Sequence, residues 1–229
     1  MPNYIMTARE LADRAVAIAE NYKTLYVMGS FGAPMTDSNK TRYIQHHSYN
    51  QRPERTEMIR AASGDTFGFD CVCLIKGILW GWTGDKAAPY GGARYAYNGV
   101  PDVSANGMIS LCRDVSENFF AIEPGEAVWL DGHIGVYIGG GLAVECTPKW
   151  ENKVQITAVG NLGTRVGYHT RTWTKHGKLP WVDYSPSQPA ADSPLGERAR
   201  TYTATEVEEM VGDVLTQALE SLRKRMKSN

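Results

Sequence analysis

Cys71 is the residue of this chain best placed to act as a nucleophile. It directly follows a Gly-Phe-Asp turn, near the start of the apolar run 69–82, which is predicted to form a buried helix. A thiol at a helix N-terminus faces unpaired backbone N–H groups and the positive end of the helix dipole, and both favour the thiolate. The same N–H groups can stabilise an oxyanion. The alternative is that Cys71 is a small buried core residue, as most free cysteines are.

His133 and Glu145 are expected to complete the chemistry. His133 follows an Asp-Gly turn and begins a predicted strand, where its imidazole can take the thiol proton and return it to a leaving amine. Antiparallel pairing about the glycines at 139–141 would place residue 134 opposite Glu145, beside His133, so that a carboxylate orients the imidazole. Taken alone, each residue has a plainer explanation, an exposed histidine at a strand start and a solvated glutamate on a strand face.

Four short segments occur in the order of a known pattern. They are Tyr26-Val27-Met28-Gly29, Phe69-Asp70-Cys71-Val72-Cys73-Leu74, Gly125-Glu126-Ala127-Val128-Trp129 and Gly132-His133-Ile134-Gly135-Val136-Tyr137-Ile138-Gly139. Together they resemble the NlpC family of papain-like cell-wall cysteine peptidases, over most of residues 7–184. The resemblance implies a papain-like α+β fold, with Cys71 as nucleophile and His133 as general base. It also implies hydrolysis of peptidoglycan stem peptides, most often between D-glutamate and the diamino acid, without a cofactor.

The resemblance also implies roles for three further positions. Glu145 stands where the family usually has His, sometimes Asn or Gln, as the third polar residue. Tyr26 matches a tyrosine that lines the site near the oxyanion, and Asp70 matches an aspartate that helps to hold the free amine of the stem peptide. Val72-Cys73 replaces the family's Ser-Gly, which removes a hydroxyl from the substrate side. Cys73 projects about 200° round the helix from Cys71, so Cys71 is the expected nucleophile and Cys73 a core residue.

Other histidines and the tryptophans are weaker candidates. His46-His47 has no cysteine or carboxylate at ligand spacing, so no metal site is expected. His169 and His176 are alternatives for the third polar residue if Glu145 points away. Five tryptophans are candidates for lining a glycan groove, with core or rim packing as the alternative: Trp80, Trp82, Trp129, Trp150 and Trp173.

These residues must be positioned by predicted helices in the first half of the chain and by predicted strands after them. Hydrophobic spacing and a Thr7–Glu10 capping box predict a helix over residues 7–22, and further helices are expected at 54–62, 69–82 and 104–116. The rest of the polar stretch 29–68 is expected to be a loop that forms a lid or a wall over the groove. Short β-rich runs predict strands over residues 127–130, 134–138, 142–146, 154–159, 170–174 and 181–184. The fold class is therefore α+β, with N-terminal helices packed on a central antiparallel sheet.

The composition changes after residue 184. We expect a catalytic domain over residues 1–184, a linker rich in Pro, Ser and Ala over 185–204, and an amphipathic helix over 205–229. That C-terminal helix is long enough to dock on the domain or to pair with copies of itself, so a homo-oligomer is one expected outcome.

Composition excludes several classes of protein. The 229 residues are 42% hydrophobic and 21% charged, which is typical of a globular chain, and the net charge of -1 gives no overall basic field for nucleic acid. No apolar run reaches the roughly 18 residues of a membrane span. The four cysteines lack the spacing of a disulfide framework or a zinc site and are expected to be reduced.

These expectations combine into one function and two alternatives. The chain is expected to hydrolyse bacterial peptidoglycan, its expected partner, through Cys71, His133 and Glu145. Because the N-terminus lacks a signal peptide, we expect synthesis in the cytoplasm and release by a separate pore, as for a phage or prophage lysin. The alternatives are an amidase that cuts between N-acetylmuramic acid and L-alanine, and a non-catalytic wall-binding or virion structural protein that keeps the fold.

Overall fold

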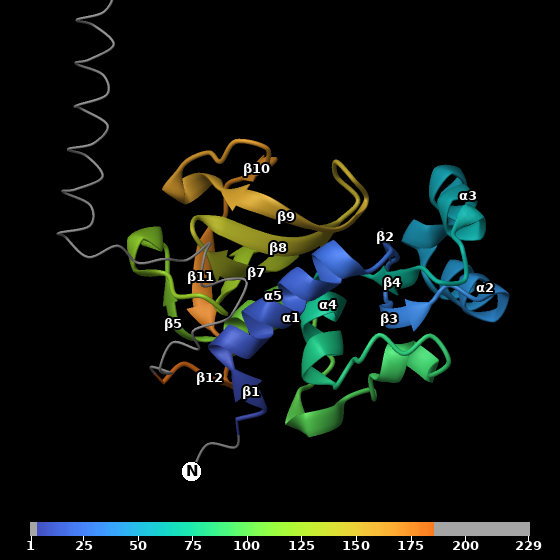
Figure 1. Ribbon diagram of the computed structural model, residues 1–229, viewed down its shortest axis with the longest axis horizontal. Coiled ribbons are helices and arrows are strands. Elements are labelled where there is room, and N and C mark those ends of the chain that lie inside the picture. Colours follow the sequence, from blue (N-terminus) through green and yellow to red (C-terminus); the bar gives the residue numbers. More distant parts are fainter. Residues whose placement is uncertain (1–3, 186–229) are drawn as a thin grey trace, which may run out of the picture. The chain divides into compact units, whose positions relative to one another are not determined.

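The computed structural model describes residues 4–185, in which helices and strands are mixed along the chain (Figure 1). The predicted helix at 205–229 and all of the predicted linker except Ser185 lie outside the described residues. No helix within residues 4–185 is long and apolar enough to cross a membrane.

The described helices and strands alternate irregularly along the chain. The helices are α1 (Ala8–Asn21), α2 (Asp37–His46), α3 (Pro53–Ala61), α4 (Cys71–Leu79) and α5 (Ala105–Leu111). The strands are β1 (Met6–Thr7), β2 (Thr24–Tyr26), β3 (Phe31–Pro34), β4 (Phe67–Phe69), β5 (Arg113–Ser116), β6 (Ala127–Leu130), β7 (His133–Gly139), β8 (Leu142–Thr147), β9 (Lys153–Val159), β10 (Thr170–Arg171), β11 (Lys175–Lys178) and β12 (Val182–Asp183). Short 3-10 turns occupy Ser48–Gln51, Pro89–Gly92, Tyr97–Gly99, Phe119–Ala121 and Gly160–Leu162.

A seven-stranded sheet forms the centre, in the order β10-β9-β8-β7-β6-β11-β5. The run from β6 to β9 is antiparallel and follows the chain, which confirms the predicted strands there. β10 is parallel to β9. β11 was not predicted, because Lys-His-Gly-Lys lacks apolar alternation; it forms by pairing with β5 and β6. The predicted last strand does not complete this sheet, since β12 pairs with β1 instead.

Two helices pack on this sheet and on each other (Figure 1). α1 begins at the predicted capping box, in which Thr7 and Glu10 cap each other's backbone N–H groups, and it buries one apolar face. Every residue of α4 is buried, as the apolar run predicted. Gly77 allows β3 to pass close to α4, because a Cβ there would lie 2.7 Å from the carbonyl oxygen of Phe31.

The polar stretch before Cys71 is more ordered than expected. Only α3 was predicted there, yet the stretch also contains α2 and β3, and β3 pairs with β4 in a small sheet of order β2-β4-β3. α2 has a single buried residue, Tyr43, so it carries no hydrophobic period that could have revealed it. The helix expected at 104–116 is also shorter, since α5 ends at Leu111 and β5 follows.

The pairing of β7 with β8 differs from the expected register by one residue. Gly135, rather than residue 134, lies opposite Glu145, and the register shifts between Tyr137 and Gly139. Side chains alternate between the two faces of a strand, so the expected register would have put Glu145 and His133 on opposite faces. The irregularity near the turn therefore brings both side chains to the same face.

Gly135 lies between His133 and Glu145 on that face, and it provides a test of the packing. A Cβ on Gly135 would lie 2.8 Å from the carbonyl oxygen of Val144 and 3.3 Å from the ring of Trp173. We therefore expect Gly135→Ala to lower the free energy of unfolding by about 1–3 kcal/mol, as overpacking does. Chemical denaturation measures this change.

Gly64→Ala is the matched control, because nothing lies within 4 Å of a Cβ at Gly64. We expect this control to unfold at or slightly above the parent's denaturant midpoint. Equal stability of the two variants would show that the sheet accommodates a methyl group at Gly135.

Candidate active site

Cys71 is the first residue of α4, and its place is set by Asp70 at the N-cap. The Asp70 carboxylate accepts a hydrogen bond from the N–H of Cys73 at 2.7 Å, which caps the helix. Its other oxygen accepts from the N–H of Gly29 at 2.8 Å. Asp70 thus ties the turn after β2 to the start of α4. The predicted contact of Asp70 with a substrate amine stays a prediction, and its two backbone bonds account for its position.

His133 and Glu145 form the hydrogen bond that the residue types predicted. Nε2 of His133 lies 2.6 Å from Oε2 of Glu145, and the Glu145 side chain has no exposure to solvent. The imidazole stacks on the indole of Trp173, with ring centres 5.5 Å apart and planes 7° from parallel. The ring is therefore held by a bond at its edge and by a contact on its face, and Nδ1 is the nitrogen that Glu145 leaves free.

Two residues that the sequence did not indicate complete the surroundings of Glu145. The Thr157 hydroxyl donates to Oε1 at 2.8 Å, and Nε of Arg171 lies 2.8 Å from Oε1 and 2.7 Å from Oε2. They come from β9 and β10, and Arg171 is 26 residues from Glu145. A lone arginine in a two-residue strand carries no pattern that would single it out.

The charge of Glu145 is stabilised by these partners. Burial opposes its ionisation, but the hydrogen bonds from His133 and Arg171 and the electrostatic attraction to them outweigh burial and hold the pKa of Glu145 below its usual value. Glu145 is therefore ionised at neutral pH. Because Arg171 offsets that charge, the carboxylate can orient His133 with little net negative charge at the site.

Cys71 lies beside the start of β7, but its thiol is not a ready thiolate. The backbone N–H of Ile134, the residue after His133, interacts with the Cys71 sulfur, which places the thiol next to that strand. The side chain is buried, with 8% exposure. Burial, together with the negative charge of Asp70, raises the pKa of Cys71 to about 12, and the N–H groups at the helix start only partly oppose this. The expected preference for thiolate was wrong, so the thiol needs a base.

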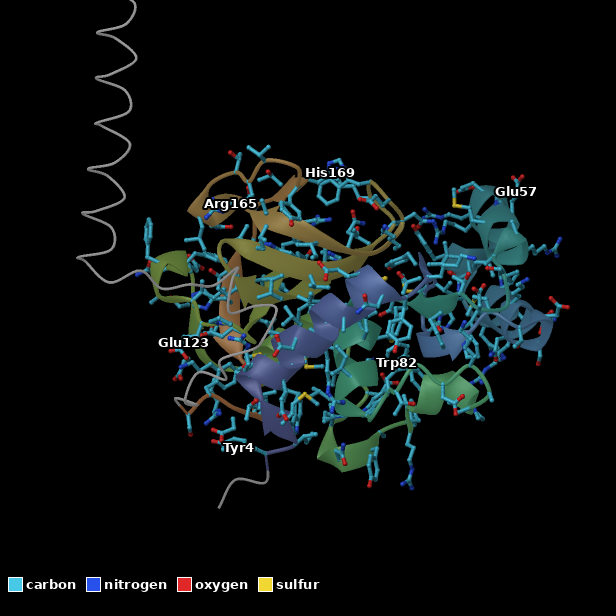
Figure 2. All side chains as sticks on the ribbon, in the orientation of Figure 1. Tyr4, Glu57, Trp82, Glu123, Arg165 and His169 are labelled. Carbon is cyan, nitrogen blue, oxygen red and sulfur yellow. The ribbon has the colours of Figure 1, made fainter. Side chains whose placement is uncertain are left out.

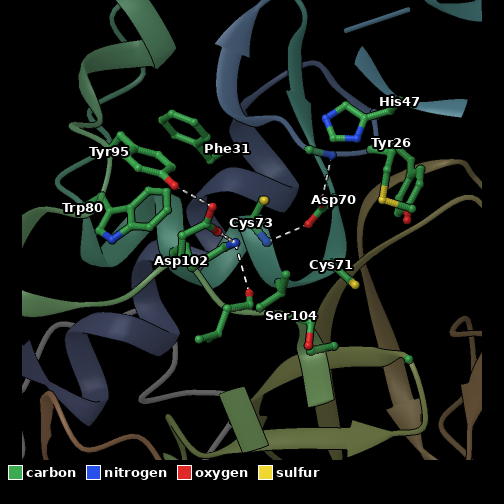
Figure 3. Close-up of a pocket in the computed structure, with 17 residues that line it drawn as sticks. Tyr26, Phe31, His47, Asp70, Cys71, Cys73, Trp80, Tyr95, Asp102 and Ser104 are labelled. Atoms are coloured by element: carbon green, nitrogen blue, oxygen red, sulfur yellow. Dashed lines mark hydrogen bonds and ion pairs between the residues drawn. The ribbon is translucent and has the colours of Figure 1, made fainter. Parts of the chain in front are cut away.

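A cleft of about 510 Å³ opens next to the thiol, and we call it the Cys71 cleft (Figure 3). Its lining includes Tyr26, Asp70, Cys71 and Gly132, the residue before His133. Cys73 is buried in the core, as expected, and it also reaches the lining of this cleft. The sulfurs of Cys71 and Cys73 point in different directions from α4 (Figure 3).

Tyr26 lies in the wall of the Cys71 cleft, and its expected place near an oxyanion stays a prediction. Burial and the nearby Cys71 and Asp70 raise its pKa, so its hydroxyl stays protonated. The Arg55 guanidinium donates to the Tyr26 carbonyl oxygen and lies over the Tyr26 ring, 5.5 Å from its centre. The phenol is thus a fixed neutral group beside the thiol.

The two alternative histidines are engaged elsewhere. His176 is buried on β11, where Nδ1 contacts Glu126 and Nε2 contacts the carbonyl oxygen of Asn118 at 3.0 Å. His169 stacks on Trp150 with ring centres 5.0 Å apart, on the connection that leads into β10 (Figure 2). Neither forms a hydrogen bond with His133 in the described part of the chain.

The remaining candidates fall on the cleft or in the core. Among residues 4–185 no group of three His, Cys, Asp or Glu side chains is arranged to hold a metal ion. Trp80 lines the Cys71 cleft, whereas Trp82 is buried with its indole N–H bonded to the carbonyl oxygen of Gly32. Trp173 packs on His133, and its role at the site was not foreseen.

Arg171→Gln tests whether Arg171 offsets the buried charge. The variant leaves the Glu145 carboxylate short of a partner, and removing one member of a buried ion pair costs about 3–5 kcal/mol. The pKa of Glu145 is lower in the folded protein than its usual value, so its paired charge stabilises the fold at neutral pH. This contribution is lost as the pH falls and the carboxylate takes up a proton. We expect the cost of Arg171→Gln, measured by chemical denaturation, to be full at about pH 7 and smaller at about pH 4.

The double variant Glu145→Gln/Arg171→Met is the control, because it removes both charges. It should recover part of the stability that Arg171→Gln loses. A cost of Arg171→Gln that is the same at both pH values would show that Arg171 acts only by packing on Trp150 and Trp173.

Comparison with known proteins does not assign this chain to a family. No protein-family model matches its sequence, and no curated protein is significantly similar to it. The arrangement of Cys71, His133 and Glu145 therefore carries the functional argument.

Proposed function

We propose that this chain is a cysteine peptidase of papain-like, NlpC-type fold that hydrolyses stem peptides of peptidoglycan. The observation that carries the proposal is the 2.6 Å hydrogen bond between His133 Nε2 and the buried Glu145, on the strand that begins beside Cys71. A nucleophile, a base and a residue that orients the base are the three parts of such a site.

The first half of the reaction forms an acyl-enzyme. Nδ1 of His133 accepts the thiol proton while the Cys71 sulfur attacks the substrate carbonyl carbon. The N–H groups of Cys71 and Val72 are the donors for the resulting oxyanion, since the N–H of Cys73 is already bonded to Asp70. The protonated His133 then gives its proton to the leaving amine, and the C–N bond breaks.

The second half releases the acid. Water attacks the thioester while His133 accepts one of its protons. The carbon–sulfur bond then breaks, and His133 gives that proton to the departing sulfur, which restores the Cys71 thiol and the neutral imidazole. Glu145 holds the imidazole orientation through both halves and stabilises the imidazolium form. Arg171 and Thr157 hold Glu145 in turn, so they are positioning residues.

The choice of substrate rests on the four segments that resemble cell-wall peptidases. Tyr26, Asp70, Cys71 and His133 lie around one cleft or beside it, which supports that resemblance. The non-catalytic alternative is favoured by one observation, the burial and raised pKa of Cys71. A substrate-bound state in which His133 takes the proton removes this difficulty, because the base and not the bulk solvent then receives it.

The test is digestion of purified peptidoglycan by the full chain and by Cys71→Ala, with fragments identified by mass spectrometry. We expect new free amino termini on the diamino acid, and a loss of at least about a thousandfold in rate in Cys71→Ala. Cys112→Ala is the matched control, because Cys112 lies outside the Cys71 cleft.

The fragments also separate the alternatives. New amino termini on L-alanine would instead identify the amidase. Intact peptidoglycan that binds both the parent and Cys71→Ala would identify a wall-binding protein and refute the catalytic proposal.

A further inference from the structure

A second hollow of about 490 Å³ adjoins the Cys71 cleft. We call it the Arg42 hollow, and its lining consists of Gly29, Phe31, Arg42, Tyr43, His46, His47, Tyr90 and Tyr95. Four of these residues also line the Cys71 cleft: Gly29, Phe31, His47 and Tyr95. Because the two hollows share these lining residues, they form one groove that includes both Cys71 and Phe31.

The Arg42 hollow has positive charge without an acidic partner. None of its lining residues is acidic, and Arg42 takes part in no ion pair among the described residues. Within residues 4–185 the guanidinium donates one hydrogen bond, to the hydroxyl of Tyr90. A guanidinium has five N–H donors in a planar fork, so most of its donors are left for a ligand.

Aromatic rings fix the position of that guanidinium. Its central carbon lies 5.1 Å from the centre of the Tyr90 ring and 5.7 Å from that of Tyr43. Tyr90 in turn packs on Phe31 with ring centres 4.5 Å apart. The guanidinium thus lies against flat aromatic rings. Such surfaces suit an organic ligand better than a small inorganic ion.

His47 stands where the two hollows meet. Its imidazole packs directly on Gly29, since a Cβ at that residue would lie 2.0 Å from Nε2 of His47. The N–H of Gly29 is bonded to Asp70, the cap of the helix that carries Cys71. A ligand on His47 is therefore positioned against the same turn that positions the nucleophile.

The acidic groups of the Cys71 cleft already have partners. Asp70 accepts two backbone N–H bonds, and Asp102 is paired with Lys76 and accepts from the Tyr95 hydroxyl at 2.8 Å. The unpaired positive charge of the groove is accordingly at Arg42. A planar carboxylate matches the guanidinium fork and gains charge-assisted hydrogen bonds there.

We propose that the Arg42 hollow is a substrate subsite that binds a carboxylate of the peptide held at Cys71. This subsite rests on the proposed function, because it lies on the same groove and takes the same substrate. The carboxylate contacts Arg42, with His47 at the junction, while the adjoining part of the peptide packs against the rings of Phe31 and Tyr90.

The test uses the full chain as Cys71→Ala, which binds but does not cut, and isothermal titration calorimetry. The probes are a synthetic stem tetrapeptide and versions of it in which each carboxylate is converted singly to an amide. We expect one of these amides to bind about tenfold more weakly, as loss of a charged hydrogen bond predicts. Adding Arg42→Gln should remove that difference, and Arg42→Lys should keep part of it.

Arg94→Gln is the matched control. Arg94 is also exposed and lies over a tyrosine ring, 4.4 Å from the centre of Tyr97, but it lines neither hollow. The amide that binds weakly to the parent should bind equally weakly to this control.

Any of four results would overturn the subsite. Equal binding of all the peptides, or a difference that persists in Arg42→Gln, would refute it while leaving hydrolysis at Cys71 intact. Arg42-dependent binding of inorganic phosphate, with no preference among the peptides, would assign the hollow to phosphate groups instead. Failure of Cys71→Ala to bind any of the peptides would reject the proposed substrate class, and the subsite with it.

Discussion

The carboxylate of Glu145 is ionised without exposure to water, and much of the surrounding structure follows from that constraint. A buried charge is costly unless it is paired and hydrogen-bonded, so every oxygen of Glu145 needs donors. Those donors come from three other strands: His133 from β7, Thr157 from β9 and Arg171 from β10. The same contacts that compensate the charge also fix the orientation of the imidazole. The stability of this part of the sheet and the geometry of the site therefore depend on the same contacts.

Cys71, the proposed nucleophile, is positioned by a second set of contacts, on a helix and not on the sheet. Asp70 caps α4 and binds the turn at Gly29, while all residues of α4 are buried. Cys71 is therefore carried by a helix and His133 by a strand. Placement on rigid elements favours a fixed geometry between the two side chains, because little conformational entropy is lost when they are brought together for the proposed reaction.

Much of this arrangement could be predicted from sequence, and what could not has physical reasons. Local signals identified α1 by its capping box, α4 by its apolar run, and β6 to β9 by short β-rich segments between glycine turns. The register between β7 and β8 was predicted wrongly, because a bulge depends on backbone pairing, which the residue types alone do not indicate. Arg171 and β11 were missed because both are defined by partners far away in the chain. The raised pKa of Cys71 was not predicted, because burial is a property of the whole fold. Its effect on the pKa outweighs the opposite effect of the N–H groups at the helix start.

The protonated state of Cys71 also affects how this thiol withstands an oxidising environment. Peroxides and alkylating agents react with the thiolate, so a buried thiol with a pKa of about 12 is consumed slowly at neutral pH. The nearby Cys73 thiol has a pKa raised by burial in the same way, which slows the exchange chemistry that would join the two sulfurs. Under the proposed mechanism, the same burial that protects the sulfur from these reagents is overcome only where His133 withdraws the proton.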